Sequence, residues 1–228
     1  ADMASIIKFA NKNKLKVIED AAQAIGVKWN GQHCGSFGDV GSFSFFADKT
    51  ITTGEGGFVC TNSETIYKKL LYIRNQGRLN RGSFQHPEIG YNFRITDIQC
   101  AIGLVQLKKL DIIIQKKQTI LQLYKNNLHG VNGIKILEAV NNSNHVPFRV
   151  AILFDVKINE IMNYLSNNNI ETIHNKFTNS IYAYEHGLCM PSFPELKESE
   201  IIYVCDKLKE ALSMTATELY NFNKKLKS

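Results

Sequence analysis

The chain has 228 residues, of which 44% are hydrophobic and 21% are charged, with a formal net charge of +6. These values are typical of a globular protein with one large domain or two smaller ones, and they exclude a disordered or low-complexity chain. The basic residues are dispersed, with no block of five like charges. An RNA-binding role would therefore rest on net charge alone, and we expect no nucleic acid partner.

The cysteines and the apolar runs indicate the compartment. The five cysteines are odd in number and have no C-x-x-C spacing, which argues against a zinc site or a disulfide framework and favours a reducing environment. No apolar run has the length of a membrane span, and the chain does not open on a signal-peptide pattern. We therefore expect a cytoplasmic protein with neither a metal nor a membrane partner.

The first elements place an acidic residue at a strand end. Apolar residues at helical spacing predict a helix from Met3 to Ala10, with Asp2 as its N-cap. Residues 15–18 then resemble a short parallel strand, with Asp20 at its carboxyl end, where open α/β sheets bind ligands. Gln23 follows three residues later and could face the same site. The alternative for Asp20 is a helix N-cap that needs no ligand.

The next strand, predicted over residues 42–46, leads to a lysine. Alternation places Phe43 and Phe45 on one face of this strand. Lys49 follows, and the glycines after it would let backbone approach a ligand closely. Because a buried lysine costs desolvation energy, we interpret Lys49 as forming a Schiff base with a carbonyl cofactor. The alternative is a hairpin with a surface lysine.

Ser44 lies five residues before Lys49, so its hydroxyl can lie near the lysine's end of the strand. It is a candidate phosphate ligand. The alternative is a buried serine that is hydrogen-bonded to backbone.

The rest of the chain predicts a second domain. A strand over 57–61 and a helix over 63–75 precede one long helix that opens at Thr96-Asp97. We expect its buried stripe to continue to the middle of the chain; the stripe comprises Ile98, Ala101, Ile102, Val105, Leu121, Tyr124 and Leu128. Beyond Gly130 the chain alternates between short strands and helices, predicted over 134–137, 148–154, 158–168 and 199–212. The domains predicted are 1–112 and 113–228, and the isolated His174 and His186 are expected to be structural or at the surface.

Five motifs in order resemble the DegT/DnrJ/StrS family of pyridoxal-phosphate aminotransferases. They are Val17-Ile-Glu-Asp-Ala-Ala-Gln23, Gly38-Asp-Val-Gly-Ser-Phe-Ser-Phe45, Lys49-Thr-Ile-Thr-Thr-Gly-Glu-Gly-Gly57, Arg74-Asn-Gln-Gly77 and Gly90-Tyr-Asn-Phe-Arg-Ile-Thr-Asp-Ile-Gln-Cys-Ala-Ile-Gly103. The resemblance implies an α/β chain: part of a fold type I large domain, with a mostly parallel sheet, plus a smaller α+β domain. It is close over residues 1–112 and thinner to Leu196.

The resemblance also implies roles for individual residues. Lys49 matches the lysine that binds pyridoxal 5'-phosphate as a Schiff base, and Asp20 matches the carboxylate that keeps the pyridine nitrogen protonated. Gln23 matches a residue near the 3-oxygen of the cofactor, and Ser44 matches a phosphate ligand. Asn92 matches a residue that reaches the cofactor phosphate of the neighbouring subunit, with Arg94 close behind, which implies a homodimer.

The implied reaction moves an amino group from glutamate to a keto group of a nucleotide-linked sugar, in amino-sugar and polysaccharide biosynthesis. Relatives also carry a preceding glycine-rich phosphate loop that has no counterpart here, so we expect this chain alone to bind the cofactor weakly or not at all. The segments between Lys135 and Phe148 and between Ile173 and Gly187 are shorter than usual, so the particular sugar is left open. The alternative function is a non-catalytic fragment that serves only as an interaction module.

Overall fold

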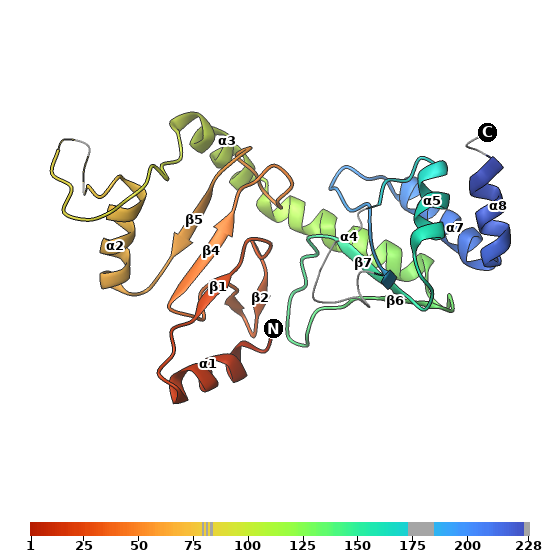
Figure 1. Cartoon of the computed structure of the whole chain (residues 1–228), viewed down its shortest axis with the longest axis horizontal. Helices are drawn as coiled ribbons and strands as arrows, with labels where there is room; N and C mark the ends of the chain where they lie inside the picture. The colour runs from red at the N-terminus through yellow and green to blue at the C-terminus, as the bar shows by residue number, and fades with distance from the viewer. Residues whose placement is uncertain (79, 81, 83, 173–184, 226–228) are drawn as a thin grey trace. The chain divides into compact units, whose positions relative to one another are not determined.

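The computed structural model describes residues 1–78, 80, 82, 84–172 and 185–225 (Figure 1). The chain forms two compact units, Ala1–Ile114 with Val140–Val146 and Gln115–Ala139 with Pro147–Ser228. Segment 140–146 thus belongs to the first unit, although it follows residues of the second. The predicted division into domains 1–112 and 113–228 stays a prediction. His174, and with it the predicted shortening beyond Ile173, falls outside the described residues.

A three-stranded sheet with the order β1-β4-β5 organises the first unit (Figure 1). Strand β1, Ile18–Asp20, pairs in parallel with β4, Val40–Ser44, and β4 pairs antiparallel with β5, Gly57–Cys60. The predicted parallel strand is therefore present. The predicted shared face is also present, because the rings of Phe43 and Phe45 both contact Phe58, with centroids 4.4 and 5.4 Å away.

The first strand begins at Ile18 and not at the predicted Leu15. The reason is that the side chain of Asp39, and not a neighbouring strand, accepts the hydrogen bond from the backbone before Ile18. The N–H of Val17 donates to the Asp39 carboxylate at 2.9 Å, and Lys16 Nζ donates to the same carboxylate at 2.8 Å. The hydrogen bond from Lys16, followed by that from Val17, lowers the pKa of Asp39.

The local signals of the first unit are confirmed. Helix α1, Met3–Lys12, is capped by the Asp2 carboxylate, which accepts from Ser5 N at 3.1 Å. Helix α2 spans Glu64–Arg74 with Ser63 as its N-cap. Strands β2, Lys28–Trp29, and β3, Gln32–His33, are joined by Asn30 and Gly31, both with positive φ, as a two-residue hairpin of this sequence requires.

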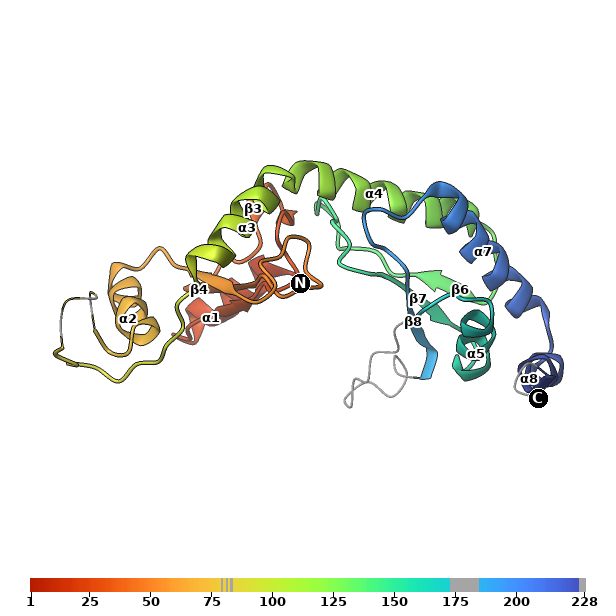
Figure 2. The same ribbon diagram turned by 90° about the horizontal axis from the view of Figure 1, so that it is seen from above.

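The prediction of one long helix is wrong. The chain forms α3, Asp97–Lys108, and α4, Leu110–Asn127, which follow one another in Figure 2 and are separated at Lys109. The side of α3 that faces the protein carries Gln99 and Gly103. The stripe predicted to be buried on α3 is instead exposed, and Ile98 is 77% exposed. On and after α4 the prediction holds, since Leu121, Tyr124 and Leu128 are buried.

The second unit has its own antiparallel sheet, with the order β6-β7-β8. Its strands are β6, Ile134–Ile136, β7, Val150–Phe154, and β8, Gly187–Met190. Its helices, besides the later turns of α4, are α5, Asn159–Asn167, α7, Glu198–Ser213, and α8, Ala216–Lys225. Strand β8 and helix α8 were not predicted, because the first is short and the second is largely polar.

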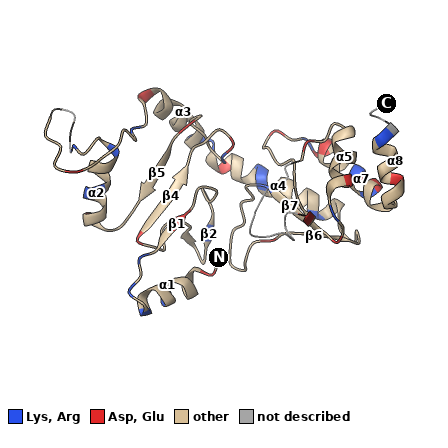
Figure 3. Ribbon diagram, in the orientation of Figure 1, with Lys and Arg blue, Asp and Glu red and all other residues tan. Residues whose placement is uncertain are grey.

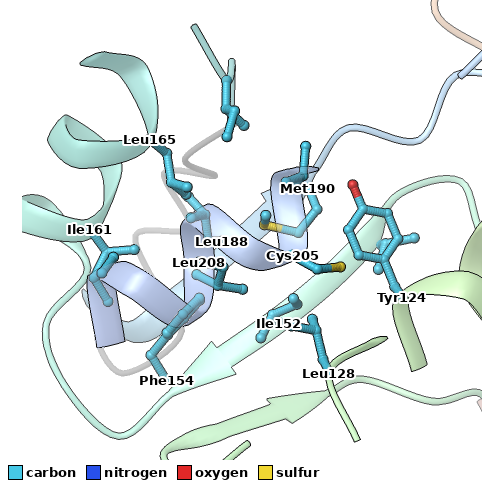
Figure 4. Close-up of a cluster of buried hydrophobic side chains, with 14 of the residues drawn as sticks. Tyr124, Leu128, Ile152, Phe154, Ile161, Leu165, Leu188, Met190, Cys205 and Leu208 are labelled. Atoms are coloured by element: carbon cyan, nitrogen blue, oxygen red, sulfur yellow. The ribbon is translucent and has the colours of Figure 1, made fainter. Parts of the chain in front are cut away.

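One apolar core joins these elements (Figure 4). Strand β7 supplies Ile152 and Phe154, both fully buried, and α7 supplies Leu208 and Cys205. The ring of Tyr124 reaches the same cluster from α4 (Figure 4). Burial raises the pKa of the Tyr124 hydroxyl, so this group stays protonated and donates to the Pro191 carbonyl at 2.9 Å.

We expect Tyr124→Phe to destabilise the protein by about 1–2 kcal/mol, because the Pro191 carbonyl loses its hydrogen-bond donor. Urea unfolding of the native and variant proteins measures this difference. Tyr220→Phe is the matched control, since Tyr220 is 55% exposed, and it should leave the midpoint unchanged. An equal effect of the two substitutions would contradict the role of the buried hydrogen bond.

Basic and acidic residues are interspersed along the described chain (Figure 3). None of the described helices combines the length and the apolar character needed to cross a membrane. The five cysteines are free, and Cys189 and Cys205 are buried. The ring of His186 is half-buried and its Nδ1 forms a hydrogen bond with the Phe154 carbonyl at 2.9 Å, which is the structural one of the two predicted roles.

Candidate active site

Two of the predicted site residues lie at the same edge of the first sheet. Because β1 and β4 are parallel, their carboxyl ends meet at one edge, and the register pairs Asp20 with Ser42, two residues before Ser44. The ladder continues one step further, since Ala21 N donates to the Ser42 carbonyl at 2.8 Å. Asp20 and Ser44 therefore come from adjacent strand ends.

Asp20 does not cap a helix. Its carboxylate accepts from Ala22 N at 3.1 Å, and residues 22–26 form turns. The side chain is exposed, with oxygen capacity left for a ligand. Gln23 lies in the same turns and is also exposed. The helix N-cap alternative for Asp20 is therefore wrong.

Lys49 is placed by the connection between β4 and β5. These strands do form a hairpin, but the Lys49 side chain is only 15% exposed, so the surface-lysine alternative does not describe it. Its Nζ lies 3.7 Å from Oδ1 of Asp48, and its backbone N–H donates to the Phe46 carbonyl at 3.1 Å. Because protein atoms cover most of this side chain, its amine can take only a limited range of positions.

The loop that carries Lys49 is anchored at several points. Thr53 N and Thr52 Oγ1 both donate to the Phe45 carbonyl at 3.0 Å, next to the end of β4. Gln99 of α3 donates through Nε2 to the Glu55 carbonyl at 2.9 Å. Helix α3 is itself fixed by a capping box between Thr96 and Gln99. The strand end and the helix start thus hold the Lys49 loop between them.

Ser44 is half-buried, and its Oγ accepts from Phe46 N at 3.1 Å. The backbone contact that was considered as the alternative is therefore present. A hydroxyl has a second lone pair and a hydrogen to donate. The contact thus orients Ser44 and does not use up its capacity to bind a phosphate.

Asn92 and Arg94 are placed differently from the other candidates. Asn92 pairs through backbone with Asn75 at the end of α2. Arg94 Nη1 donates to Asn75 Oδ1 at 3.0 Å and lies 3.5 Å from Gln76 Oε1. The described hydrogen bonds of Arg94 join it to this segment, and none joins it to the sheet edge. The structure therefore places Asp20 and Ser44 at adjacent strand ends, Gln23 and Lys49 in the segments that follow these ends, and Asn92 and Arg94 next to the end of α2.

One residue was overlooked as a candidate. Glu19, between the neighbours Ile18 and Asp20, accepts three backbone N–H groups at 2.6 to 2.7 Å. The available signal was a second acid next to Asp20 in a strand, which alternation points to the opposite face of the sheet. The backbone N–H groups that donate to Glu19 on that face belong to a loop that only the tertiary structure brings there.

A sequence profile described as the DegT/DnrJ/EryC1/StrS aminotransferase family matches residues 1–175. The chain belongs to this family. The family resemblance predicted from the five motifs is thus confirmed. The match extends beyond the sheet edge and through most of the described strands.

Individual relatives agree with this assignment. The chain is 36% identical over 229 residues to a GDP-perosamine synthase of Escherichia coli O157:H7, covering 93% of this chain and 62% of that protein. It is 35% identical over 150 residues to a UDP-4-amino-4,6-dideoxy-N-acetyl-beta-L-altrosamine transaminase of Campylobacter jejuni, covering 64% of this chain and 40% of that protein. The chain thus spans less than two thirds of the length of these relatives.

Solved structures support the fold class. The aminotransferase TlmJ of Streptoalloteichus hindustanus superposes with a TM-score of 0.87 at 22% identity, covering 93% of this chain and 63% of that one. The predicted fold, part of a fold type I large domain plus a smaller domain, is confirmed.

Proposed function

We propose that the protein carrying this chain is a pyridoxal-phosphate-dependent aminotransferase. It moves an amino group from glutamate to a keto group of a nucleotide-linked sugar. The observation that carries this proposal is the sheet edge, where a carboxylate, a hydroxyl and a mostly buried lysine come from the ends of β1 and β4 and the loop that follows. Family membership over residues 1–175 supports the same chemistry.

The residues present fit the cofactor chemically. The Lys49 amine suits an aldehyde carbon, the Asp20 carboxylate suits a protonated ring nitrogen, and the Ser44 hydroxyl suits a phosphate oxygen. Asp20 is exposed and the Ser44 hydroxyl can still donate, so both residues retain hydrogen-bonding capacity for a ligand. When bound, the pyridoxal ring supplies an electron sink for the reacting α-carbon.

Each of these residues then has a defined task. Lys49 would hold the cofactor covalently until the amino donor replaced it, and the released Nζ would then take the proton from the α-carbon of the donor. Asp20 would hold a proton on the ring nitrogen by its negative charge. Ser44 would donate to the phosphate, and Gln23 would lie near the 3-oxygen. Anchoring of the Lys49 loop at Phe45 and Glu55 keeps the amine in position for both tasks.

The proposed substrate class is taken from the names of the relatives, and the proposed assembly from the positions of two residues. The names of the two bacterial relatives specify GDP-linked and UDP-linked amino sugars, and we extend a nucleotide-linked keto sugar to this protein. We further propose a homodimer in which Asn92 and Arg94 serve the site of the partner subunit. The described hydrogen bonds of Arg94 go to Asn75 and Gln76 at the end of α2 and not to the strand ends of its own chain, which supports this assignment. The free cysteines are compatible with a cytoplasmic protein.

The test is a half-reaction. The protein carrying this chain is loaded with pyridoxal 5'-phosphate, and glutamate is added without a sugar. We expect the absorbance of the bound aldehyde form to fall while one equivalent of 2-oxoglutarate appears. A keto sugar linked to GDP or UDP should then restore the original spectrum. Stable binding without any 2-oxoglutarate would instead support the alternative of a non-catalytic module.

We expect Asp20→Asn to lower the rate of this half-reaction by about a hundredfold, because a neutral amide cannot hold the ring nitrogen protonated. Asp155→Asn is the matched control, since Asp155 is exposed in the second unit. The rates follow from stopped-flow absorbance with glutamate. A native rate for Asp20→Asn would remove Asp20 from the proposed site.

A further inference from the structure

Glu19 and its register partners hold one residue of a neighbouring loop. The register across the first sheet aligns Glu19 of β1 with Gly41 of β4 and with Cys60 of β5. All three meet Gly35. Glu19 Oε2 accepts from Gly35 N at 2.7 Å, and Cys60 Sγ donates to the Gly35 carbonyl at 3.2 Å.

Gly41 completes this row by having no side chain. A Cβ at Gly41 would lie 1.9 Å from the Gly35 carbonyl oxygen, so only glycine lets the loop approach the sheet. Gly35 itself has φ +87, and a Cβ there would lie 2.4 Å from Cζ of Phe43. Because Gly35 and Gly41 have no side chains, the loop can pack closely against this face of the sheet.

The Glu19 carboxylate also binds the next turn of the loop. Its Oε1 accepts from Phe37 N at 2.6 Å and from Gly38 N at 2.7 Å. Three N–H groups on a half-buried carboxylate are charge-assisted hydrogen bonds, which are stronger than those between neutral groups. Residues 35–38 lead directly into β4, so Glu19 ties the start of β4 to β1.

Alternation along β1 connects this loop to the proposed site. The Glu19 and Asp20 side chains lie on opposite faces of the sheet, and the rows Glu19-Gly41-Cys60 and Asp20-Ser42-Val59 are adjacent. Because Glu19 and Asp20 share a peptide unit, any displacement of the Glu19 backbone is transmitted to the backbone of Asp20. The direction of the Asp20 carboxylate thus depends on contacts on the far face.

We propose that Glu19 is a positioning residue that acts through Asp20, fixing the direction of the carboxylate toward the cofactor's ring nitrogen. This inference rests on the proposed function. Glu19 touches neither substrate nor cofactor in this assignment. A change at Glu19 therefore alters cofactor affinity only when residue 20 is an aspartate.

A double-mutant cycle tests the coupling. Dissociation constants for pyridoxal 5'-phosphate are measured for the native protein, Glu19→Gln, Asp20→Asn and the double variant. The Glu19→Gln substitution puts a neutral amide opposite three N–H donors. We expect Glu19→Gln to weaken binding about tenfold when Asp20 is present and less than about twofold when residue 20 is Asn. The same factor in both backgrounds would overturn the proposal, since a merely structural residue gives additive effects.

Asp39→Asn is the matched control. The Asp39 carboxylate accepts from Val17 N and Lys16 Nζ just before β1, so its amide variant alters a hydrogen-bonded carboxylate next to the same strand. We expect an effect on cofactor affinity that does not depend on residue 20. Coupling to Asp20 as large as that of Glu19→Gln would overturn the specific role of Glu19.

A milder variant covers the case in which Glu19→Gln does not fold. Cys60→Ala removes the thiol from the Gly35 carbonyl and should weaken binding about twofold to threefold, again only with Asp20 present. Additive behaviour of Cys60→Ala would then count against the proposal. If the native protein does not bind the cofactor, or if Asp20→Asn does not weaken binding, the proposed site itself is wrong. Tight native binding with additive effects refutes the Glu19 inference alone.

Discussion

Replacing Lys49 by alanine should abolish the transamination half-reaction, with a loss of at least about a thousandfold. The proposed mechanism gives this amine two tasks, covalent attachment of the cofactor and proton transfer at the α-carbon. The side chain is 15% exposed and its loop is tied to Phe45 and to α3, so the amine has a restricted range of positions. The measurement is formation of 2-oxoglutarate from glutamate by the cofactor-loaded protein.

A second measurement separates attachment from proton transfer. Borohydride reduction followed by mass spectrometry should join the cofactor to the peptide that contains Lys49 in the native protein, and leave Lys49→Ala unlabelled. Lys68→Ala is the matched control, because Lys68 is 64% exposed and pairs only with Glu64 on α2 among the described salt bridges. Label on any other lysine of the native protein would refute the assignment of Lys49.

Replacing Phe154 by alanine should destabilise the protein by about 3–5 kcal/mol. Phe154 is fully buried at the end of β7, within the cluster that also contains Leu208 and Ile161. Removing the ring loses its transfer free energy and leaves a cavity, because close-packed neighbours relax only in part. Urea or thermal unfolding of the protein measures the difference in free energy of unfolding.

Phe193→Ala is the matched control for the same side chain in the same unit. Phe193 is 54% exposed, so its loss should cost less than about 1 kcal/mol. Equal destabilisation by both substitutions would contradict the position of the core. A loss of cofactor affinity caused by Phe193→Ala without a loss of stability would indicate a further role for this ring.

Local sequence determined much of the secondary structure. The Asp2 cap of α1 and the opening of α3 at Thr96 were both predictable, because each depends on residues within four positions of one another. The prediction of one long helix failed because the end of α3 and the burial of its faces depend on more than nearby residues. Periodicity runs through Lys109, where the backbone turns, and cannot show that the apolar stripe on α3 is exposed while the stripe on α4 is buried.

Some features of the candidate site were likewise determined by the sequence, and others only by folding. The order of the motifs was sufficient to identify the family and to name Asp20, Ser44 and Lys49, because the order of motifs is a property of the sequence. That Asp20 bonds to a turn and caps no helix, and that Lys49 is largely covered, depends on residues brought together by folding. No local pattern contains this information.

Glu19 shows the limit most clearly. The sequence by itself determined the family, the parallel strand and an acidic pair at its end, since these follow from residue types and their spacing. Only the tertiary structure decided that one acid is exposed at the sheet edge while the other binds three N–H groups of residues 35–38. The physical reason is that hydrogen-bond partners sixteen to nineteen residues away are selected by strand register and by the space left at Gly41, and both are set when the sheet forms.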